Sequence, residues 1–387
     1  MEQVELAINI INLKIAKEIK ENKEKEYDKF KEKIVKLENE RNQIYLGNKE
    51  IINKVIEKYL KEVKEQKMSE VKNEKYDLTK EEFESSLKMA ELALLMRTKT
   101  SDKPKSIFIV SQAGGGKTGL KAFVEAEKQR EQTGDLFVEI NPDEVAIYHK
   151  YYEQILKEFP NESYAKLQKF ILPALDQYLR QRAVQLRNNI IQEGTFGSTE
   201  GYLEILNFQR NGGKAKIGNM QENGEREEVE VKGGYDVEID VLAVDRFESL
   251  LSSYEREQRF IELNLPPRAV TAENHDRAYN KMLETLQQID DKKLYDKIRV
   301  FKRGKIETTP ELVYTAGEKT YPNVVECIKQ TRNEDRKRLF ANSEDYLKRI
   351  ESLKSRVKTK IQMDKITKLE QEFCQLLAKE QEEQEQK

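Results

Sequence analysis

The stretch SIFIVSQAGGGKTGLKAF, residues 106–123, is the feature that most constrains how this chain of 387 residues can fold. Its apolar start has the composition of a buried strand, and its end begins a helix-like pattern. Between them lie Gly114, Gly115 and Gly116, followed by Lys117 and Thr118. A strand, a glycine turn and a helix in this order are typical of a parallel sheet with helices on its faces.

The glycine turn has the residues needed to hold phosphate groups. Glycines let the backbone curl so that its N–H groups point inward at phosphate oxygens, at the positive end of the following helix. In this pattern Lys117 bridges the β and γ phosphates of a nucleotide, and Thr118 offers its hydroxyl to Mg²⁺. The pattern GxxxxGKS/T has glycine where this chain has Ser111, which we expect to fit at a mild cost. We therefore predict a loop that binds ATP or GTP with Mg²⁺.

The charge of the chain is high but balanced. Lysine and arginine number 69, aspartate and glutamate number 71, and the net charge is −2. No global field favours an anionic partner, so we expect neither nucleic acid nor a membrane. The N-terminus lacks the positive charge of a signal peptide and no apolar run could span a bilayer, which predicts a cytoplasmic protein. Two distant cysteines, Cys327 and Cys374, predict neither a disulfide nor a zinc site.

Three parts are predicted along the chain: residues 1–76, 77–330 and 331–387. The first part is helical, with apolar residues three, four or seven apart among lysines and glutamates. Its first apolar seam consists of Ile8, Ile11, Ile15 and Ile19. We weigh a solvated hairpin or coiled-coil oligomerisation module against an interaction module that packs on another surface. The third part is again a charged helical extension.

The middle part alternates strands and helices. Apolar runs suited to strands begin at residues 106, 136, 189, 235 and 297, and the segments between them are of helical length. This alternation predicts an α/β fold with a parallel sheet flanked by helices. The glycine-rich segment 211–234 is expected to be a loop or a small β-hairpin. A helix capping box at Thr79 and Glu82 places the start of this part near Asp77.

Polar residues that follow the predicted strands are candidates for the site, because ligands in an open α/β sheet bind beyond the carboxyl ends of its strands. Asp143 follows the second strand, where a carboxylate can accept a proton from a substrate hydroxyl; capping a helix is the structural alternative. Glu193 and Thr195 follow the third strand. Arg256 and Arg268 lie downstream, where they either stabilise a transferring phosphoryl group or are ordinary surface charges.

The order of these motifs resembles that of the zeta toxins of epsilon/zeta toxin–antitoxin systems, which are P-loop kinases of UDP-N-acetylglucosamine. The matching elements are SQAGGGKT at the loop, NPD ending at Asp143, EGT at 193–195, ER at 255–256, RAVT from Arg268 and HD at 275–276. The resemblance covers about residues 77–301 and implies a P-loop kinase-like sheet. The family's substrate-contacting glutamate before the third strand has no clear match, since Asp176 and Gln177 stand there.

The resemblance implies a phosphotransferase whose active-site residues can be named. Lys117 and Thr118 would hold ATP and Mg²⁺, Asp143 would be the base, and Arg256 and Arg268 would stabilise the transferring phosphate. Glu193 and Thr195 match positions that hold the substrate or organise the site, and Asp143 would also meet the substrate. His275 is expected to be a structural histidine.

The expected function is phosphorylation of a hydroxyl of UDP-N-acetylglucosamine or a related sugar nucleotide, by the toxin of a toxin–antitoxin system. Two alternatives stay open: a P-loop kinase of a nucleic-acid end or an antibiotic, and a non-catalytic, nucleotide-gated interaction protein. In the two-gene systems a separate helical antitoxin blocks the nucleotide site. The expected partner is therefore such a protein, or residues 1–76 acting in cis.

Overall fold

The computed structural model describes residues 76–96, 100–130, 137–159, 163–221, 225–263, 267, 269–304 and 309–385, and single residues 11, 14, 36, 37, 39, 40, 50, 51 and 54. The chain forms two compact units. The first consists of Met1–Ile107, Thr118–Glu193 and Asn207–Asp236, and the second of Phe108–Lys117, Gly194–Leu206 and Val237–Lys387. Most of the N-terminal apolar seam lies outside the described residues; Ile11 is helical and buried.

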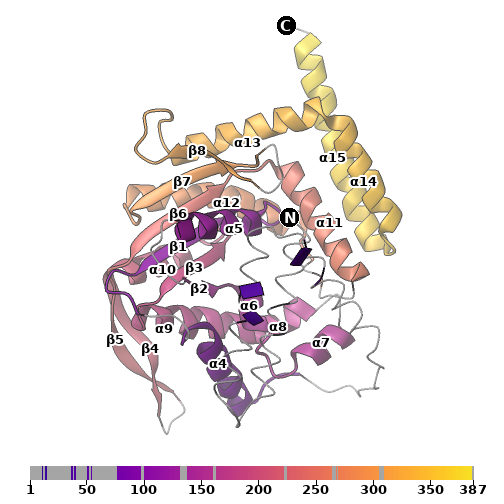
Figure 1. The fold of residues 1–387 in the computed structure, drawn as a ribbon. Coiled ribbons are helices and arrows are strands. Elements are labelled where there is room, and N and C mark those ends of the chain that lie inside the picture. Colours follow the sequence, from indigo (N-terminus) through magenta and orange to yellow (C-terminus); the bar gives the residue numbers. More distant parts are fainter. Residues whose placement is uncertain are drawn as a thin grey trace. The chain divides into compact units, whose positions relative to one another are not determined.

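Six of the eight described strands form one sheet in the order β2-β3-β1-β6-β7-β8 (Figure 1). The strands are β1 Lys105–Val110, β2 Phe137–Ile140, β3 Asn189–Gly194, β6 Asp236–Leu242, β7 Lys297–Lys302 and β8 Glu311–Thr315. β2 pairs with β3, and β6 with β7, in parallel, whereas β8 is antiparallel to β7. Strands buried on both faces read as continuous apolar runs, which is why five of the six were predictable. The α/β fold with helices flanking a mostly parallel sheet is confirmed, and β8 makes the sheet mixed.

The first unit contains most of the short helices. They are α4 Lys80–Leu94, α6 Pro142–Ala146, α7 Tyr152–Glu158, α8 Ser163–Ala174, the π-helical turn η1 Leu175–Leu179 and α9 Arg180–Gln185. Two helices have residues assigned to both units. In α5 Lys117–Arg130 the first residue belongs to the second unit, and in α10 Thr199–Asn211 the residues up to Leu206 do. The predicted capping box is present, because the Thr79 hydroxyl accepts from the Glu82 N–H and the Glu82 carboxylate accepts from the Thr79 N–H.

The glycine-rich segment 211–234 forms the expected hairpin. β4 Gly212–Met220 and β5 Arg226–Lys232 pair antiparallel as a separate two-stranded sheet. The Arg226 guanidinium forms an ion pair with Glu84 on α4 and lies 4.3 Å from the centre of the Tyr178 ring. The hairpin is thus attached to the helices of the first unit by a charge pair and a cation–π contact.

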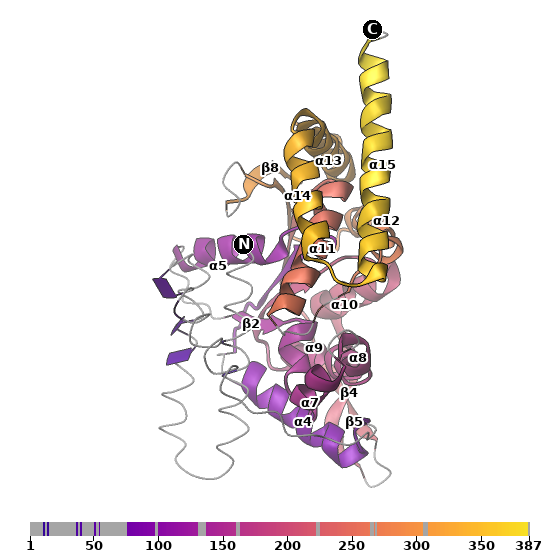
Figure 2. The ribbon, with the colours of Figure 1, turned by 90° about the vertical axis from the view of Figure 1, so that its right-hand side faces the viewer.

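The second unit contains five long helices among its described residues: α11 Arg246–Glu262, α12 Ala272–Asp291, α13 Val324–Ala341, α14 Ser343–Arg356 and α15 Lys360–Glu385. α14 and α15 lie side by side in both views (Figure 1, Figure 2). They share an apolar core with α11 and α13. Its members are Phe247, Leu250, Leu251, Tyr254, Leu339, Tyr346, Ile350, Leu353, Ile366, Leu369 and Phe373. The boundary predicted at residue 330 lies inside α13. No helix in the described part of the chain has the length and apolar composition needed to cross a membrane.

Candidate functional site

The loop between β1 and α5 has the backbone that the sequence predicts. β1 ends at Val110 and α5 begins at Lys117. Gly114 and Gly116 have φ angles of +70° and +102°, a region that residues with a Cβ rarely adopt. The predicted strand–turn–helix arrangement is therefore present.

The loop is also packed too tightly for larger residues. A Cβ at Gly114 would lie 1.9 Å from the carbonyl oxygen of Ser249 and 2.5 Å from the Ser253 hydroxyl, both on α11. A Cβ at Gly115 would lie 2.0 Å from the hydroxyl of Ser111. The close approach of α11 at Gly114 and of Ser111 at Gly115 leaves no room for a side chain at either position.

Ser111 and Gln112 hold the start of the loop. The buried Ser111 hydroxyl donates to the carbonyl of Leu242 at the end of β6 (2.9 Å). The Gln112 amide donates to the carbonyl of Val244 (2.9 Å) and to the Ser249 hydroxyl (3.0 Å). Serine in place of the pattern's glycine thus gains a hydrogen bond that a glycine could not make.

The segment after β3 lies next to the loop. The backbone N–H of Ser111 donates to the carbonyl of Gly194 (3.2 Å), so the EGT element and the start of the loop are neighbours. Thr195, the next residue, is half-buried. This agrees with the expectation that residues following a strand gather at its carboxyl end.

Lys117 folds back onto the loop. Its ammonium group donates to the carbonyls of Ser111 (3.0 Å) and Gln112 (3.2 Å). Thr118 follows it in the first turn of α5 and is half-buried. The positive charge that would meet nucleotide phosphates is therefore held at the loop by the loop's own backbone.

Arg303 also contacts the loop and was not predicted. It follows β7 directly, and its guanidinium donates to the carbonyls of Gly114 (2.7 Å) and Gly115 (3.2 Å). It also pairs with Glu248 on α11 (2.6 Å), which in turn pairs with Arg349 on α14. Burial opposes the charge of the Glu248 carboxyl, but the two guanidinium groups outweigh burial and keep its pKa below the usual value.

Arg332 on α13 makes a second contact to the loop. Its guanidinium donates to the Tyr279 carbonyl (3.0 Å), lies 3.4 Å from the Gln112 side-chain oxygen, and stacks 3.7 Å from the centre of the Tyr279 ring. Burial lowers its pKa to about 10, so it still carries its charge at neutral pH.

In the first unit, Glu193 belongs to a buried charge cluster. Lys121, only 2% exposed, pairs with Glu139 on β2 and lies 3.5 Å from a carboxylate oxygen of Glu193 at the end of β3. The Asn141 amide donates to the same Glu139 carboxylate (2.7 Å). Lys121 thus sits between the carboxylates of two neighbouring strands.

Asp143 is the second residue of α6, and its side chain lies outside the described residues. The cap of α6 is Asn141, whose side-chain oxygen accepts from the Glu144 N–H (3.0 Å). The structural alternative weighed for Asp143 was helix capping. Asn141 performs that role instead.

Three further residues flagged by the sequence have different outcomes. Arg256 is half-buried on α11, and Arg268 lies outside the described residues. His275 is buried, with one ring nitrogen 2.9 Å from the Ser249 hydroxyl and the other 3.1 Å from the Asp276 carboxylate. Burial lowers the pKa of His275, which fits a neutral, structural histidine.

The region in place of the family's substrate-contacting glutamate is exposed. Asp176 and Gln177 lie in the π-helical turn η1, both exposed, and Asp176 pairs with Arg180 one turn later. Pro173 inside α8 removes a backbone donor just before this turn, which explains the irregular helix.

A Mg²⁺–nucleotide fits the chemistry of the loop. Loop N–H groups, an ammonium and a threonine hydroxyl at a helix start suit phosphate oxygens and the metal they carry. Among the described residues no group of three or more histidine, cysteine or acidic side chains forms a separate metal site. Thr118, predicted from the sequence as a ligand of Mg²⁺, lies in the first turn of α5 beside Lys117.

Two residues of the site that we did not predict, Arg303 and Lys121, stand at positions that the sequence could have indicated. Arg303 follows the KIRVF run directly, so the rule on strand ends that selected Asp143 also selects Arg303. Lys121 stands four residues after Lys117 and therefore on the same side of α5. Arg349 carried no such signal, because its contact with Glu248 joins residues 101 positions apart.

Comparison with known proteins adds a family to this geometry. The sequence profile of the family described as Zeta toxin matches residues 91–220 and 217–311, which together make up more than half of the chain. Toxin PezT of Streptococcus pneumoniae serotype 4 is 22% identical over 245 residues, which cover 63% of this chain and 84% of PezT. A solved structure from the PezAT toxin–antitoxin system of S. pneumoniae covers 72% of this chain and 98% of its own, with a TM-score of 0.52 and 19% identity. At this identity the structural likeness shows the fold alone.

Proposed function

Because the chain belongs to the zeta toxin family, we propose that it is an ATP-dependent kinase of UDP-N-acetylglucosamine or a related sugar nucleotide. The observation that supports this best is the loop itself, with Gly114 and Gly116 in the left-handed region and Lys117 held against it. PezT is named as a toxin, so a toxin role in a toxin–antitoxin system is part of the proposal.

Phosphoryl transfer depends on positioning and charge neutralisation more than on covalent catalysis by the protein. In the proposed mechanism, loop N–H groups and Lys117 bind the ATP phosphates, and Thr118 is a ligand of Mg²⁺. When bound, Mg²⁺ neutralises phosphate charge. The substrate hydroxyl oxygen bonds to the γ-phosphorus as the bond to the bridging oxygen breaks and ADP leaves. Asp143 takes the hydroxyl proton, and Arg256 and Arg268 balance charge on the transferring group.

Glu193 and Thr195 are proposed to hold the substrate. The ammonium of Lys121, 3.5 Å from Glu193, limits the directions in which this carboxylate can turn. A carboxylate with a fixed direction can accept hydrogen bonds from the hydroxyl groups of a sugar. Lys121 would therefore act on the substrate through Glu193.

The test is direct phosphorylation. The protein is incubated with ATP, Mg²⁺ and, in separate reactions, sugar nucleotides, nucleic-acid ends and antibiotics, and mass spectrometry detects a gain of one phosphate. Lys117→Ala should abolish the product, whereas the matched change Lys348→Ala, at an exposed lysine, should not.

Asp143→Asn should keep ATP binding and lower turnover by roughly 10²–10⁴-fold. Turnover by Lys117→Ala, or phosphorylation of nucleic-acid ends or antibiotics but no sugar nucleotide, would contradict the proposal.

The partner is proposed to be an antitoxin, either a separate helical protein or residues 1–76 acting in cis. A short connection would give the tethered segment a local concentration on the order of millimolar, so a weak contact would suffice. Deletion of residues 1–76 should then raise kinase activity and make expression toxic, with relief by Lys117→Ala. Equal activity and growth with and without this segment would exclude inhibition in cis.

A further inference from the structure

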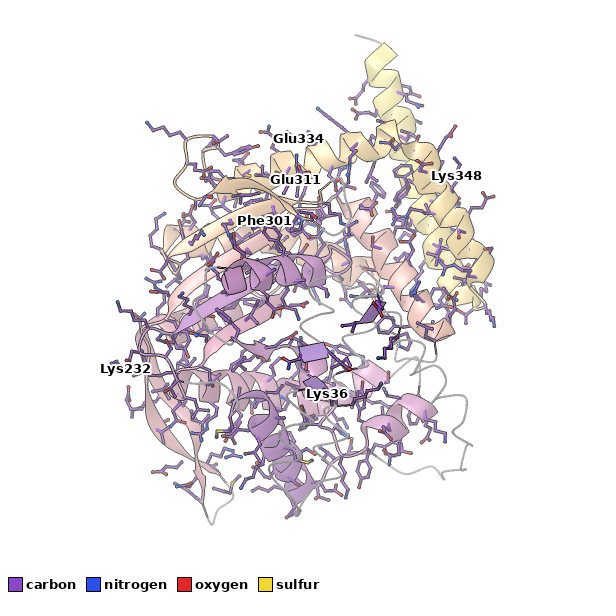
Figure 3. The ribbon with its side chains drawn as sticks, viewed as in Figure 1. Lys36, Lys232, Phe301, Glu311, Glu334 and Lys348 are labelled. Carbon is purple, nitrogen blue, oxygen red and sulfur yellow. The ribbon has the colours of Figure 1, made fainter. Side chains whose placement is uncertain are left out.

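Arg349 lies on α14, beyond the segment matched by the family profile, yet it is connected to the glycine loop. Its guanidinium donates to both carboxylate oxygens of Glu248 (3.1 and 2.8 Å) and of Glu255 (3.0 and 2.7 Å), two residues of α11. The neighbouring Lys348 projects away from the helix pair (Figure 3), with 68% of its side chain exposed. α14 thus turns its arginine toward α11 and its lysine to solvent.

Glu248 is the middle member of the connection. It is buried, with 6% of its surface exposed, and its carboxylate is shared between two arginines. One oxygen accepts from Arg303 (2.6 Å) and from Arg349 (3.1 Å). The other accepts from Arg349 (2.8 Å). Arg349 therefore occupies the oxygen that Arg303 does not use.

Arg303 is the member that touches the loop. It uses one terminal nitrogen for Glu248, and its remaining donors reach the carbonyls of Gly114 and Gly115. A trans peptide is planar, and its C=O and N–H point in opposite directions. A fixed Gly115 carbonyl therefore fixes the N–H of Gly116, one of the loop groups that would face a phosphate oxygen.

We propose that Arg349 is a positioning residue for the glycine loop, which it orients through Glu248 and Arg303. A carboxylate with two free oxygens prefers a two-point contact with a guanidinium. Without Arg349, Glu248 would take two donors of Arg303 and draw them off the carbonyls of Gly114 and Gly115. Arg349 keeps Glu248 in one-point contact with Arg303, so the other donors stay on the loop. That the loop binds ATP rests on the proposed function; its orientation by Arg349 does not.

The control is a second arginine on the same helix. Arg356 forms an ion pair with Glu262 (3.4 Å), also on α11, but both side chains are 38% exposed and neither contacts the loop network. Exposed pairs of this kind contribute little to stability. Arg356→Gln therefore removes an ion pair between α14 and α11 and leaves the Arg349–Glu248–Arg303 contacts intact. Arg349→Gln removes ion pairs between α14 and α11 and also the contact with Glu248 that leads to the loop.

Hydrogen exchange of residues 111–117 in nucleotide-free protein is the primary measurement, and ATP affinity by calorimetry is the second. Arg349→Gln should speed exchange of the loop amides about tenfold and weaken ATP binding by roughly tenfold, and Arg356→Gln should change neither. Should Arg349→Gln melt below the assay temperature, Arg349→Lys replaces it, since lysine keeps the charge but not the fork of donors.

A double-variant cycle separates positioning from general stabilisation. Arg303→Gln should change exchange and ATP binding as Arg349→Gln does, and the double variant should be no worse than Arg303→Gln alone. Equal loop exchange in Arg349→Gln and Arg356→Gln, or fully additive effects of the two loop-network variants, would overturn the proposal. If exchange responds as expected but wild-type protein binds no ATP, the positioning role stands and the proposed function fails.

Discussion

Gly114→Ala tests whether the loop is held against α11 as tightly as the structure shows. Gly114 has a φ of +70°, and an added Cβ would lie 1.9 Å from the Ser249 carbonyl oxygen. That oxygen belongs to a helix backbone and cannot rotate away. The matched control is Gly317→Ala in the same unit, because Gly317 has a similar φ of +99° and nothing within 4 Å of its added Cβ.

Both variants place alanine at a positive φ, so their losses of unfolding free energy should differ only by the clash at Gly114. A left-handed backbone costs alanine about 1–2 kcal/mol, and reduced freedom of the unfolded chain returns about 0.4–1 kcal/mol. Gly317→Ala should therefore lower the free energy of unfolding by about 1 kcal/mol. Gly114→Ala should add about 1–3 kcal/mol for forcing α11 and the loop apart. The total for Gly114→Ala is then about 2–4 kcal/mol.

Urea unfolding of nucleotide-free protein measures this difference, with a probe confined to the second unit because the two units need not unfold together. Cys327, fully buried on α13, supplies that probe through pulsed thiol labelling at each urea concentration. A midpoint for Gly114→Ala clearly below that of Gly317→Ala, at equal slope, is the expected result. Coincident unfolding curves would show that the loop does not pack on Ser249, and would refute the reasoning.

Two further predictions concern titrating groups of the second unit. In native protein near pH 7.5 a thiol reagent should modify only the exposed Cys374, and Cys327 only after unfolding, because burial raises the pKa of Cys327 to about 11. Burial also lowers the pKa of His275, so the unfolded chain takes up a proton more readily and stability falls as pH drops below about 6.5, by at most about 1.4 kcal/mol per pH unit. Urea titrations at pH 7.5 and 5 should show this loss in wild-type protein and a smaller one in His275→Gln; equal losses would assign it to other groups.

Local patterns predicted the loop and the elements around it, because their causes lie within a few residues. The apolar run of β1, the glycines of the turn and the capping box at Thr79 each depend on near neighbours. The hairpin between Gly212 and Lys232 belongs to the same class. β8 was missed because it has only 5 residues and few buried positions, and pairing with β7 makes it a strand.

The site contacts that could not be predicted join residues far apart in the sequence. Arg303 and Gly114 are 189 positions apart, and Ser111 and Leu242 are 131 apart. Neither pairing has a spacing rule, because each depends on which strands become neighbours in the sheet. The role of Asn141 was hidden for a different reason: Asn and Asp are both good helix caps, and only the start of α6 decides between Asn141 and Asp143.

The helices beyond the family profile form part of the core that supports the loop. The profile ends at residue 311, but α13, α14 and α15 cover four large apolar side chains of α11, those of Phe247, Leu250, Leu251 and Tyr254. Full burial of such side chains contributes about 1.5–3 kcal/mol each, or roughly 6–12 kcal/mol together. Because Ser249 of α11 lies against Gly114, these charged helices pack on the same helix that contacts the loop.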